Sequence, residues 1–204
     1  ANWVDDGLKS ADTDTRQAIL DFGQMCIRDR LIIEPRVFED ERGYFLETHH
    51  YQRFQAANID CTFVQDNLSF SKKNILRGLH FQKTKPQAKL LQAVSGEIFD
   101  VGVDLRPGSA TYGKWSGVEI SDENKRQLFI PEGFAHGFCV LSDCAYVAYK
   151  CSDYYNPDDE GGILWSDPDI AIDWPLKNPV LSAKDRQFGY LADQTFEAVG
   201  DKKI

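Results

Sequence analysis

Long apolar runs are missing from this chain of 204 residues. None of its runs approaches the roughly 20 residues that an α-helix needs to cross a bilayer. The first 30 residues are polar and acidic and lack the apolar core of a secretory signal peptide. The sequence therefore predicts neither a membrane protein nor a secreted one, and its length suits one domain with a full core.

Paired cysteines are also missing. The five cysteines are irregularly spaced, and no two of them form a CxxC motif. An odd number without such spacing favours neither a zinc knuckle nor a secreted disulfide framework. The simplest setting for these thiols is a reducing cytoplasm.

Positive charge is scarce, because 23 Lys and Arg stand against 32 Asp and Glu, which gives a net charge of −9. This balance argues against a nucleic-acid surface. A small anionic ligand is still compatible with it, since a local cluster of arginines and lysines can outweigh the overall field.

A His-x-His pair, which metal-binding jelly rolls usually carry, is absent. His80 is followed two residues later by Gln82, and His49 and His50 are adjacent, so they would point to opposite faces of a strand. A site of two histidines and one carboxylate could come only from His80, His136 and an acid that the sequence does not place. We predict no metal.

Sustained helical periodicity is absent before the C-terminus. Short β-type runs separated by turn residues take its place, spaced about 8–12 residues apart, which is typical of a sandwich or barrel. Short helices are expected over 51–57 and 183–191. Strands are predicted over 31–33, 44–48, 62–68, 74–81, 89–94, 98–104, 115–120, 127–130, 138–141 and 145–151.

The N-terminal stretch differs from the rest of the chain. Residues 25–30, MCIRDR, look like the translated end of a sequencing adapter. Our hypothesis is that residues 1–30 are an extension introduced by fusion or assembly. No linker or internal repeat follows, so residues 31–204 are predicted to form one domain.

The stretch 77–82, RGLHFQ, places a histidine inside an apolar alternation. In a strand, Gly78 and His80 would share one face and Arg77 would lie on the other, unless a bulge at Gly78 re-aims them. Histidine can act as a base near neutral pH. A core histidine with a backbone partner is the ordinary alternative.

Several other side chains have both an ordinary and a chemical interpretation. Arg42, Arg77 and Lys89 are either exposed edge charges or a clamp for a phosphate or a developing oxyanion. The triplet 65–67, QDN, is either a turn or the hydrogen-bonding wall of a pocket.

Tyr149 and Asp185 complete the candidate set. Aromatic residues on strands usually pack, and Asp185 could simply cap a terminal helix. Together with His80 and the cations, however, the two residues form an acid–base set with cationic support.

The order and spacing of these motifs resemble the dTDP-4-dehydrorhamnose 3,5-epimerases, cupin-type jelly-roll enzymes of deoxysugar biosynthesis. The resemblance runs from about residue 31 to 193. It implies an all-β, cupin-type jelly-roll sandwich with short peripheral helices, assembled as a homodimer. The matching segments are 34–38, 40–43, 63–67, 76–82, 96–101, 123–128, 130–138, 154–157, 163–165 and 181–185.

The resemblance also implies individual roles. His80 matches the catalytic base, Asp185 the acid that holds its imidazole, and Tyr149 the tyrosine that supplies a proton from the opposite face. Lys89 and Arg77 match groups that bind the substrate and steady the enolate. The positions that match nucleotide- or sugar-contacting residues are Arg42, Glu47, Gln65, Asn67, His136, Tyr155, Glu160 and Lys184.

The implied reaction converts dTDP-4-dehydro-6-deoxy-D-glucose to dTDP-4-dehydro-L-rhamnose without a metal or another cofactor. The segment from Arg42 to Glu47 is expected to reach the partner's site. Leu68, Phe70 and Gly161 depart from the family pattern, and the loop before Lys89 is about one residue short, so nucleotide preference or the extent of epimerisation could differ.

This chemistry suits the residues. A ketone at C4 acidifies the C–H bonds at C3 and C5. Inverting either carbon requires a base on one side, an acid on the other, and a cation for the enolate oxygen. Such a reaction needs neither a redox cofactor nor a metal.

Three alternatives stay open. An epimerase for C3 or C5 alone, or a ketoisomerase, would use the same base and acid. The missing His-x-His pair argues against a metal-dependent cupin oxygenase. The paired His80, Asp185 and Tyr149 argue against a cupin that only binds sugars.

Overall fold

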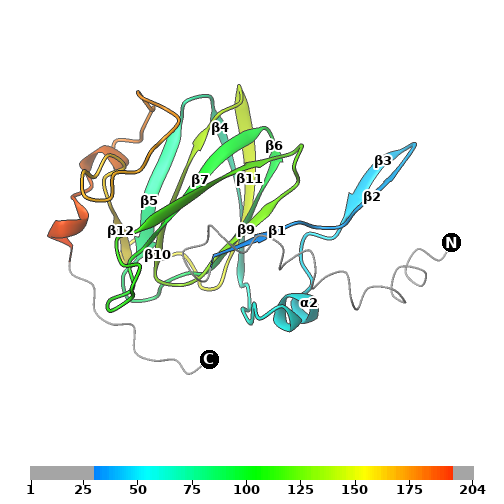
Figure 1. Cartoon of the computed structure of the whole chain (residues 1–204), viewed down its shortest axis with the longest axis horizontal. Coiled ribbons are helices and arrows are strands. Elements are labelled where there is room, and N and C mark those ends of the chain that lie inside the picture. Colours follow the sequence, from blue (N-terminus) through cyan, green and yellow to red (C-terminus); the bar gives the residue numbers. More distant parts are fainter. Residues whose placement is uncertain (1–29, 195–204) are drawn as a thin grey trace.

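Two five-stranded antiparallel sheets pack face to face and form the body of the protein (Figure 1). The computed structural model describes residues 30–194. The all-β sandwich expected from the sequence is confirmed. The first sheet contains, in spatial order, β1 (Leu31–Ile33), β9 (Gln127–Ile130), β6 (Lys89–Ser95), β11 (Cys144–Cys151) and β4 (Gln65–Lys72). The second sheet contains β12 (Glu160–Gly162), β5 (Leu76–Gln82), β10 (Phe134–Val140), β7 (Glu97–Asp104) and β8 (Trp115–Ser121).

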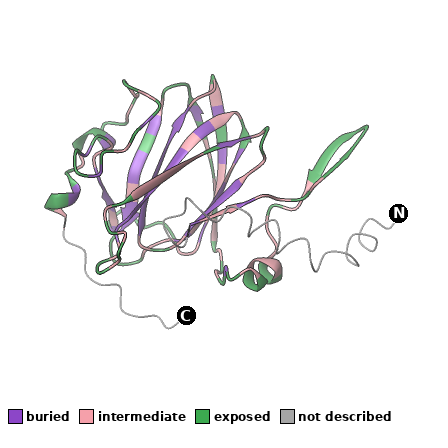
Figure 2. Cartoon of the chain, in the orientation of Figure 1, coloured by how far each residue is buried: buried purple, intermediate pink, exposed green. Residues whose placement is uncertain are grey.

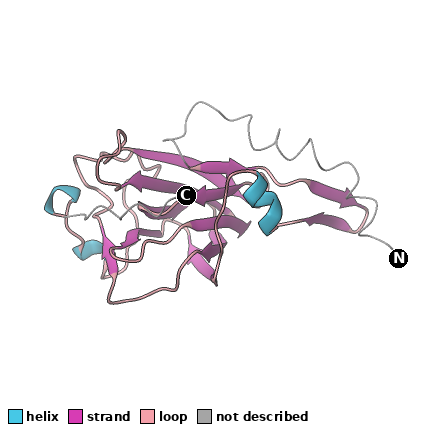
Figure 3. Ribbon diagram, turned by 90° about the horizontal axis from the view of Figure 1, so that it is seen from below, coloured by secondary structure: helices cyan, strands magenta, loops and turns pink. Residues whose placement is uncertain are grey.

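A separate hairpin of β2 (Val37–Asp40) and β3 (Gly43–Leu46) projects from one end of the sandwich (Figure 1; Figure 3). Helix α2 (Tyr51–Ala56) follows it near the base of the hairpin. The C-terminal segment, with the 3₁₀ turns η1 (Asp185–Gln187) and η2 (Leu191–Asp193), lies at the opposite end.

Alternating side chains of the two sheets meet in an apolar core, because successive residues of a strand point to opposite faces. Leu91 of the first sheet belongs to one core cluster with Phe134 and Phe138 of the second. The buried parts of the strands lie between the two sheets (Figure 2). The second sheet buries its other face as well. Leu79 packs on that side in one cluster with Trp174 of the C-terminal segment.

Strand β4 runs from Gln65 to Lys72, so the predicted strand over 62–68 begins too early and ends too early. Its alternation is inverted: Leu68 and Phe70 are exposed, whereas Ser71 is buried. The inward-facing polar residues of β4 bond to other polar groups between the sheets, as described below. The end of β4 could therefore not be found from its apolar residues.

The predicted helix over 183–191 is wrong. Only the short turn η1 forms there, and the chain then runs extended. The Gly189 carbonyl accepts a bond from the Leu164 N–H, and the Leu191 N–H donates to the Asp167 carboxylate. These backbone groups bond to a neighbouring loop and so cannot continue a helix.

Other boundaries differ by smaller amounts. Strand β10 begins at Phe134 rather than at 138, directly after a turn in which Gly133 has a φ of +86°. Strands β2 and β12 were not predicted, because one borders a charged turn and the other contains two glycines.

The predicted N-terminal extension lies almost wholly outside the described residues. Its last residue, Arg30, is buried and donates hydrogen bonds to Ser116 of β8. The origin of residues 1–30 stays a hypothesis. Within residues 30–194, no helix is long and apolar enough to cross a membrane.

Asp104, at the end of β7, is a buried carboxylate that holds the following loop. It accepts hydrogen bonds from Arg106, Ser109 and Thr111. Burial alone would raise the pKa of Asp104, but these bonds lower it to about 2. The pKa of Asp104 in the folded chain is thus below its ordinary value of 3.8. Its contribution to stability is therefore complete above about pH 4 and is lost as the pH falls toward 2.

We expect Asp104→Ala to lower the free energy of unfolding at neutral pH by about 2–3 kcal/mol, because the donor groups of three residues lose a buried acceptor. Urea denaturation followed at several pH values measures this. The difference from the wild type should shrink between pH 4 and 2. Asp143→Ala is the control, since Asp143 is exposed and its contact with Lys73 is 3.4 Å long. Equal stability of the two variants would contradict the assignment.

Candidate active site

The strands of the first sheet present a row of polar side chains to the interior. Tyr149 of β11 lies opposite Asn67 of β4 and Leu91 of β6 in the strand register. Directly opposed residues share a face, and Leu91 belongs to the core between the sheets, so Tyr149 and Asn67 face inward too. Two residues further on, Cys151 lies between Gln65 and Lys89 on the same face.

A bulge in β5 brings Arg77 and His80 to one face of the second sheet. His136 and Phe138 of β10, two residues apart, are paired with His80 and Arg77, which are three residues apart. The extra residue in β5 reverses the alternation, as the sequence allowed. Gly78 makes this possible: its φ is +112°, and a Cβ at this position would lie 2.6 Å from the His136 carbonyl oxygen.

His80 and Asp185 form the central pair. His80 Nε2 lies 2.7 Å from Asp185 Oδ1, and His80 is partly exposed whereas Asp185 is buried. Burial would raise the pKa of Asp185, but the bond with His80, together with bonds to Ser182 and the Gly78 backbone, lowers it below its ordinary value. The carboxylate is therefore ionised and can orient the imidazole.

The pKa values of Tyr149 and Lys89 are shifted in opposite directions. Burial is the main factor that raises the pKa of Tyr149, so its hydroxyl keeps its proton at neutral pH. Burial also lowers the pKa of Lys89, against the opposing influence of Cys151, Asp100 and Glu160. The site therefore contains a protonated phenol and a partly destabilised ammonium.

Glu160 of β12 joins two further predicted residues. Its carboxylate accepts bonds from the Tyr155 hydroxyl and from the Lys184 ammonium. Burial would raise the pKa of Glu160, but these bonds and the nearby charge of His80 lower it. The bond to Glu160 raises the pKa of Tyr155 to about 12.

Two amide side chains of β4 bond to residues of the site. Gln65 donates to Asn67 at 2.9 Å and accepts from the Tyr155 backbone N–H at 2.8 Å. Asn67 in turn contacts the Cys151 sulfur at 3.6 Å. The triplet predicted as either a turn or a pocket wall is thus the first part of a strand whose amides face the interior.

Two residues that the sequence did not single out, Ser71 and Asp100, contact predicted residues of the site. Arg77 Nε donates to the Ser71 hydroxyl of the facing sheet at 2.9 Å, so Arg77 bridges the two sheets. His136 Nε2 lies 2.7 Å from Asp100 Oδ2, and both residues are buried. An acid inside the apolar alternation of β7 was the only available signal for Asp100.

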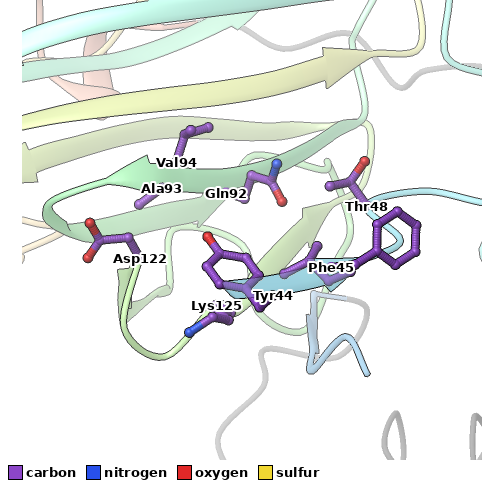
Figure 4. A pocket seen from close by; sticks show the side chains of 9 residues that line it. Tyr44, Phe45, Thr48, Gln92, Ala93, Val94, Asp122 and Lys125 are labelled. Atoms are coloured by element: carbon purple, nitrogen blue, oxygen red, sulfur yellow. The ribbon is translucent and has the colours of Figure 1, made fainter. Parts of the chain in front are cut away.

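Arg42 and Glu47 are not brought into this cavity by their own chain. Arg42 pairs with Asp40 at the tip of the hairpin, and Glu47 pairs with Arg53 at 2.9 Å. A shallow pocket separates the hairpin from the outer side of β6 (Figure 4). There the Lys125 ammonium lies 4.7 Å from the centre of the Tyr44 ring.

The residues that depart from the family pattern lie on β4 and β12. Leu68 and Phe70 are on the outer face of β4, where the Phe70 ring lies 4.8 Å from that of Tyr146. A Cβ at Gly161 would lie 2.5 Å from the Phe81 ring, which leaves no room for a side chain there. The expected effect of these three residues on nucleotide preference or on the extent of epimerisation stays a prediction.

The assembled groups suit proton transfer between the two sheets. A base with its carboxylate faces a protonated phenol on the opposite sheet, and two cations lie beside them. Among residues 30–194, no three His, Cys, Asp or Glu side chains are grouped so that they could hold a metal ion. The predicted absence of a metal remains a prediction.

Comparison with known proteins gives one consistent family. Residues 24–193 match the family model described as dTDP-4-dehydrorhamnose 3,5-epimerase. The epimerase of that name from Methanothermobacter thermautotrophicus is 56% identical over 161 residues, which is 78% of this chain and 87% of the relative. A dTDP-4-dehydrorhamnose 3-epimerase from Streptomyces niveus is 43% identical over 163 residues, 79% of either chain.

The solved structures agree with this result. The crystal structure of a dTDP-6-deoxy-D-glucose-3,5-epimerase from Legionella pneumophila, in complex with dTDP-4-keto-L-rhamnose, is similar with a TM-score of 0.78. Its sequence is 52% identical, and the match covers 80% of this chain and 88% of the other.

We expect Gly78→Ala to lower the free energy of unfolding by about 2–4 kcal/mol, because the new methyl group meets backbone atoms at a positive φ. Urea denaturation measures the loss, and the NMR signals of His80 report whether its bond to Asp185 survives. Gly108→Ala is a matched control, since Gly108 has a φ of +79° and nothing within 4 Å of a built Cβ. An equal effect of both substitutions would show that the close approach at Gly78 is unimportant.

Proposed function

The chain belongs to the dTDP-4-dehydrorhamnose 3,5-epimerase family, and we propose that it converts dTDP-4-dehydro-6-deoxy-D-glucose to dTDP-4-dehydro-L-rhamnose. The observation that carries this proposal is the 2.7 Å contact between His80 and Asp185 on the second sheet, opposite the first sheet on which Tyr149 faces inward. An epimerase needs a base and an acid on opposite faces of its substrate.

The first step is the removal of a proton beside the ketone. His80 takes the proton from carbon, and the ionised Asp185 stabilises the imidazolium that forms. The electron pair moves into the carbonyl group and gives an enolate at O4. Lys89 and Arg77 supply the positive charge that stabilises this oxygen.

The second step returns a proton to the other face. Tyr149 lies on the opposite sheet, and burial keeps its hydroxyl protonated, so it can donate to the carbon that His80 has deprotonated. The enolate collapses to the ketone with inverted configuration. Solvent then restores the protonation states of His80 and Tyr149.

One base can serve both carbons. In the gluco chair the hydrogens on C3 and C5 are both axial and lie on the same ring face. A single imidazole on that face can therefore reach each of them after a small shift of the ring. This geometry favours double epimerisation, although the same groups would also suffice for one carbon.

We further propose that the enzyme is a homodimer in which each hairpin completes the partner's site. The hairpin projects from the sandwich and exposes Tyr44 and Phe45, which supports this assembly (Figure 2). Arg42 and Glu47 lie on or beside it, apart from the cavity of their own chain. Arg42 would contribute a cation to the binding of the nucleotide diphosphate.

A reducing cytoplasm remains the compartment that we propose. Cys61, Cys139, Cys144 and Cys151 are free thiols. A nucleotide-linked sugar is also a cytoplasmic type of metabolite.

Solvent exchange tests the proposed roles. In heavy water, the wild type should introduce deuterium at both C3 and C5 of dTDP-4-dehydro-6-deoxyglucose, located by NMR. His80→Ala should lose at least about 100-fold in both exchange and inversion, because no other base replaces the imidazole. Tyr149→Phe should still exchange, but with retention, because His80 returns the deuteron to the face it came from.

Label at one carbon only would identify a single-site epimerase. Absence of label from both carbons with wild-type protein would refute the proposed activity. Normal turnover by His80→Ala would refute the assignment of the base.

Mixing of impaired variants tests the shared site. A dimer of one Arg42→Ala chain and one His80→Ala chain contains one intact site if the hairpin crosses to the partner. Random mixing by co-refolding should therefore restore about a quarter of the wild-type activity. His80→Ala mixed with Tyr149→Phe is the control and should restore none, because both residues belong to the same chain's cavity. No recovery in the first mixture would contradict the crossing.

A further inference from the structure

Gln82, the last residue of β5, carries a buried amide that the proposed mechanism does not use. Its side chain is on the same face of the strand as that of His80, two residues earlier. In the strand register Gln82 lies directly opposite Glu160 of β12, and opposed residues share a face. Because a buried polar side chain must be hydrogen-bonded, the partners of this amide show what it holds in place.

The Gln82 amide bonds to the backbone on both sides of Tyr155. Its Oε1 accepts a hydrogen bond from the Asn156 N–H at 2.7 Å, and its Nε2 donates to the Tyr154 carbonyl at 3.4 Å. Nε2 also donates to the Lys85 carbonyl at 2.7 Å. Two carbonyls and one N–H fix the orientation of the amide, because only its nitrogen can donate and only its oxygen can accept.

Tyr155 needs this support because burial does not hold it. It lies in the loop between β11 and β12, and half of its surface is exposed. Its own backbone N–H donates to Gln65 Oε1 at 2.8 Å. Three consecutive residues of this loop, 154–156, are thus fastened by two glutamine side chains, one from each sheet.

The position of this loop decides what the Tyr155 hydroxyl reaches. The hydroxyl donates to the Glu160 carboxylate, which also accepts a bond from the Lys184 ammonium. The resemblance to the family places these three residues among those that contact the nucleotide or the sugar. Gln82 lies behind them, beside Glu160 in the sheet, and holds the backbone from which the Tyr155 ring projects.

We propose that Gln82 is a positioning residue for substrate binding, which holds the loop of Tyr155 so that the Tyr155 hydroxyl stays on Glu160 and beside the substrate. The inference rests on the proposed function, because it takes Tyr155, Glu160 and Lys184 as substrate contacts. Gln82 acts through Tyr155 and touches no reacting atom. Its loss should therefore weaken the binding of dTDP-4-dehydro-6-deoxyglucose and leave the proton-transfer steps intact.

Steady-state kinetics of Gln82→Met separates binding from chemistry. Methionine keeps the length of glutamine but cannot donate to the two carbonyls and accepts only weakly from Asn156. We expect KM to rise about tenfold with kcat changed less than about twofold, which is the pattern of lost ground-state binding. Gln87→Met is the matched control, since Gln87 donates one bond at 2.7 Å to the Asp153 carbonyl of the same loop but none to the residues beside Tyr155. Its KM should stay within about twofold of the wild-type value.

A double variant tests whether Gln82 acts through Tyr155. Tyr155→Phe removes the hydroxyl and should itself raise KM. Adding Gln82→Met to Tyr155→Phe should raise KM by less than about twofold more, because two changes that remove the same contact are not additive. The proposal would be overturned by effects that multiply, by a wild-type KM in Tyr155→Phe, or by an unchanged KM in folded Gln82→Met.

Two NMR measurements need no substrate, so their outcome is independent of the proposed activity. In the wild type, the backbone amides of Tyr155 and Asn156 should exchange with heavy water at least about tenfold more slowly than in an unfolded peptide, although the loop is exposed. The bond to Glu160 raises the pKa of Tyr155 to about 12, and in Gln82→Met this pKa should fall toward its ordinary value of 10. Fast exchange in the wild type, or an unchanged pKa of Tyr155 in the folded variant, would overturn the proposal even if the enzyme epimerises its substrate.

Discussion

The close approach of β5 to β10 at Gly78 is the constraint on which the site depends. A side chain at this position would meet the His136 carbonyl oxygen at 2.6 Å, and the backbone there has a positive φ. The resulting bulge turns Arg77 and His80 to the same face of the second sheet. Without it, one of these two side chains would lie in the apolar layer under the C-terminal segment.

The interior of this sandwich has an apolar part and a polar part. At one part, Leu91, Phe134 and Phe138 form an ordinary apolar core. At the other, strands of both sheets present amides, a phenol, cations and carboxylates. Such buried polar groups are tolerated because they are bonded to one another, as in the pairs His80–Asp185 and His136–Asp100. The apolar part supplies the stability, and the polar part supplies the chemistry.

The electrostatics of the polar part separate the proton-transfer groups. Burial keeps Tyr149 protonated and weakens the charge of Lys89, while hydrogen bonds keep Asp185 and Glu160 ionised. Tyr149, Asp185 and Glu160 are thus biased toward the protonation states that the proposed mechanism uses, whereas burial acts against the charge of Lys89. The bias comes from the protein itself and exists before any substrate arrives.

The sequence by itself determined the all-β class and most strand positions, because a period of two and turn-forming residues are local properties. Its resemblance to a known family indicated most of the candidate residues. It could not determine the polar inward face of β4, the extended backbone of the C-terminal segment, or the pairing of Asp100 with His136. The contact between His80 and Asp185 joins residues 105 positions apart. Only the packing of the two sheets and the C-terminal segment brings such residues together, since a distance across the fold depends on every element between them.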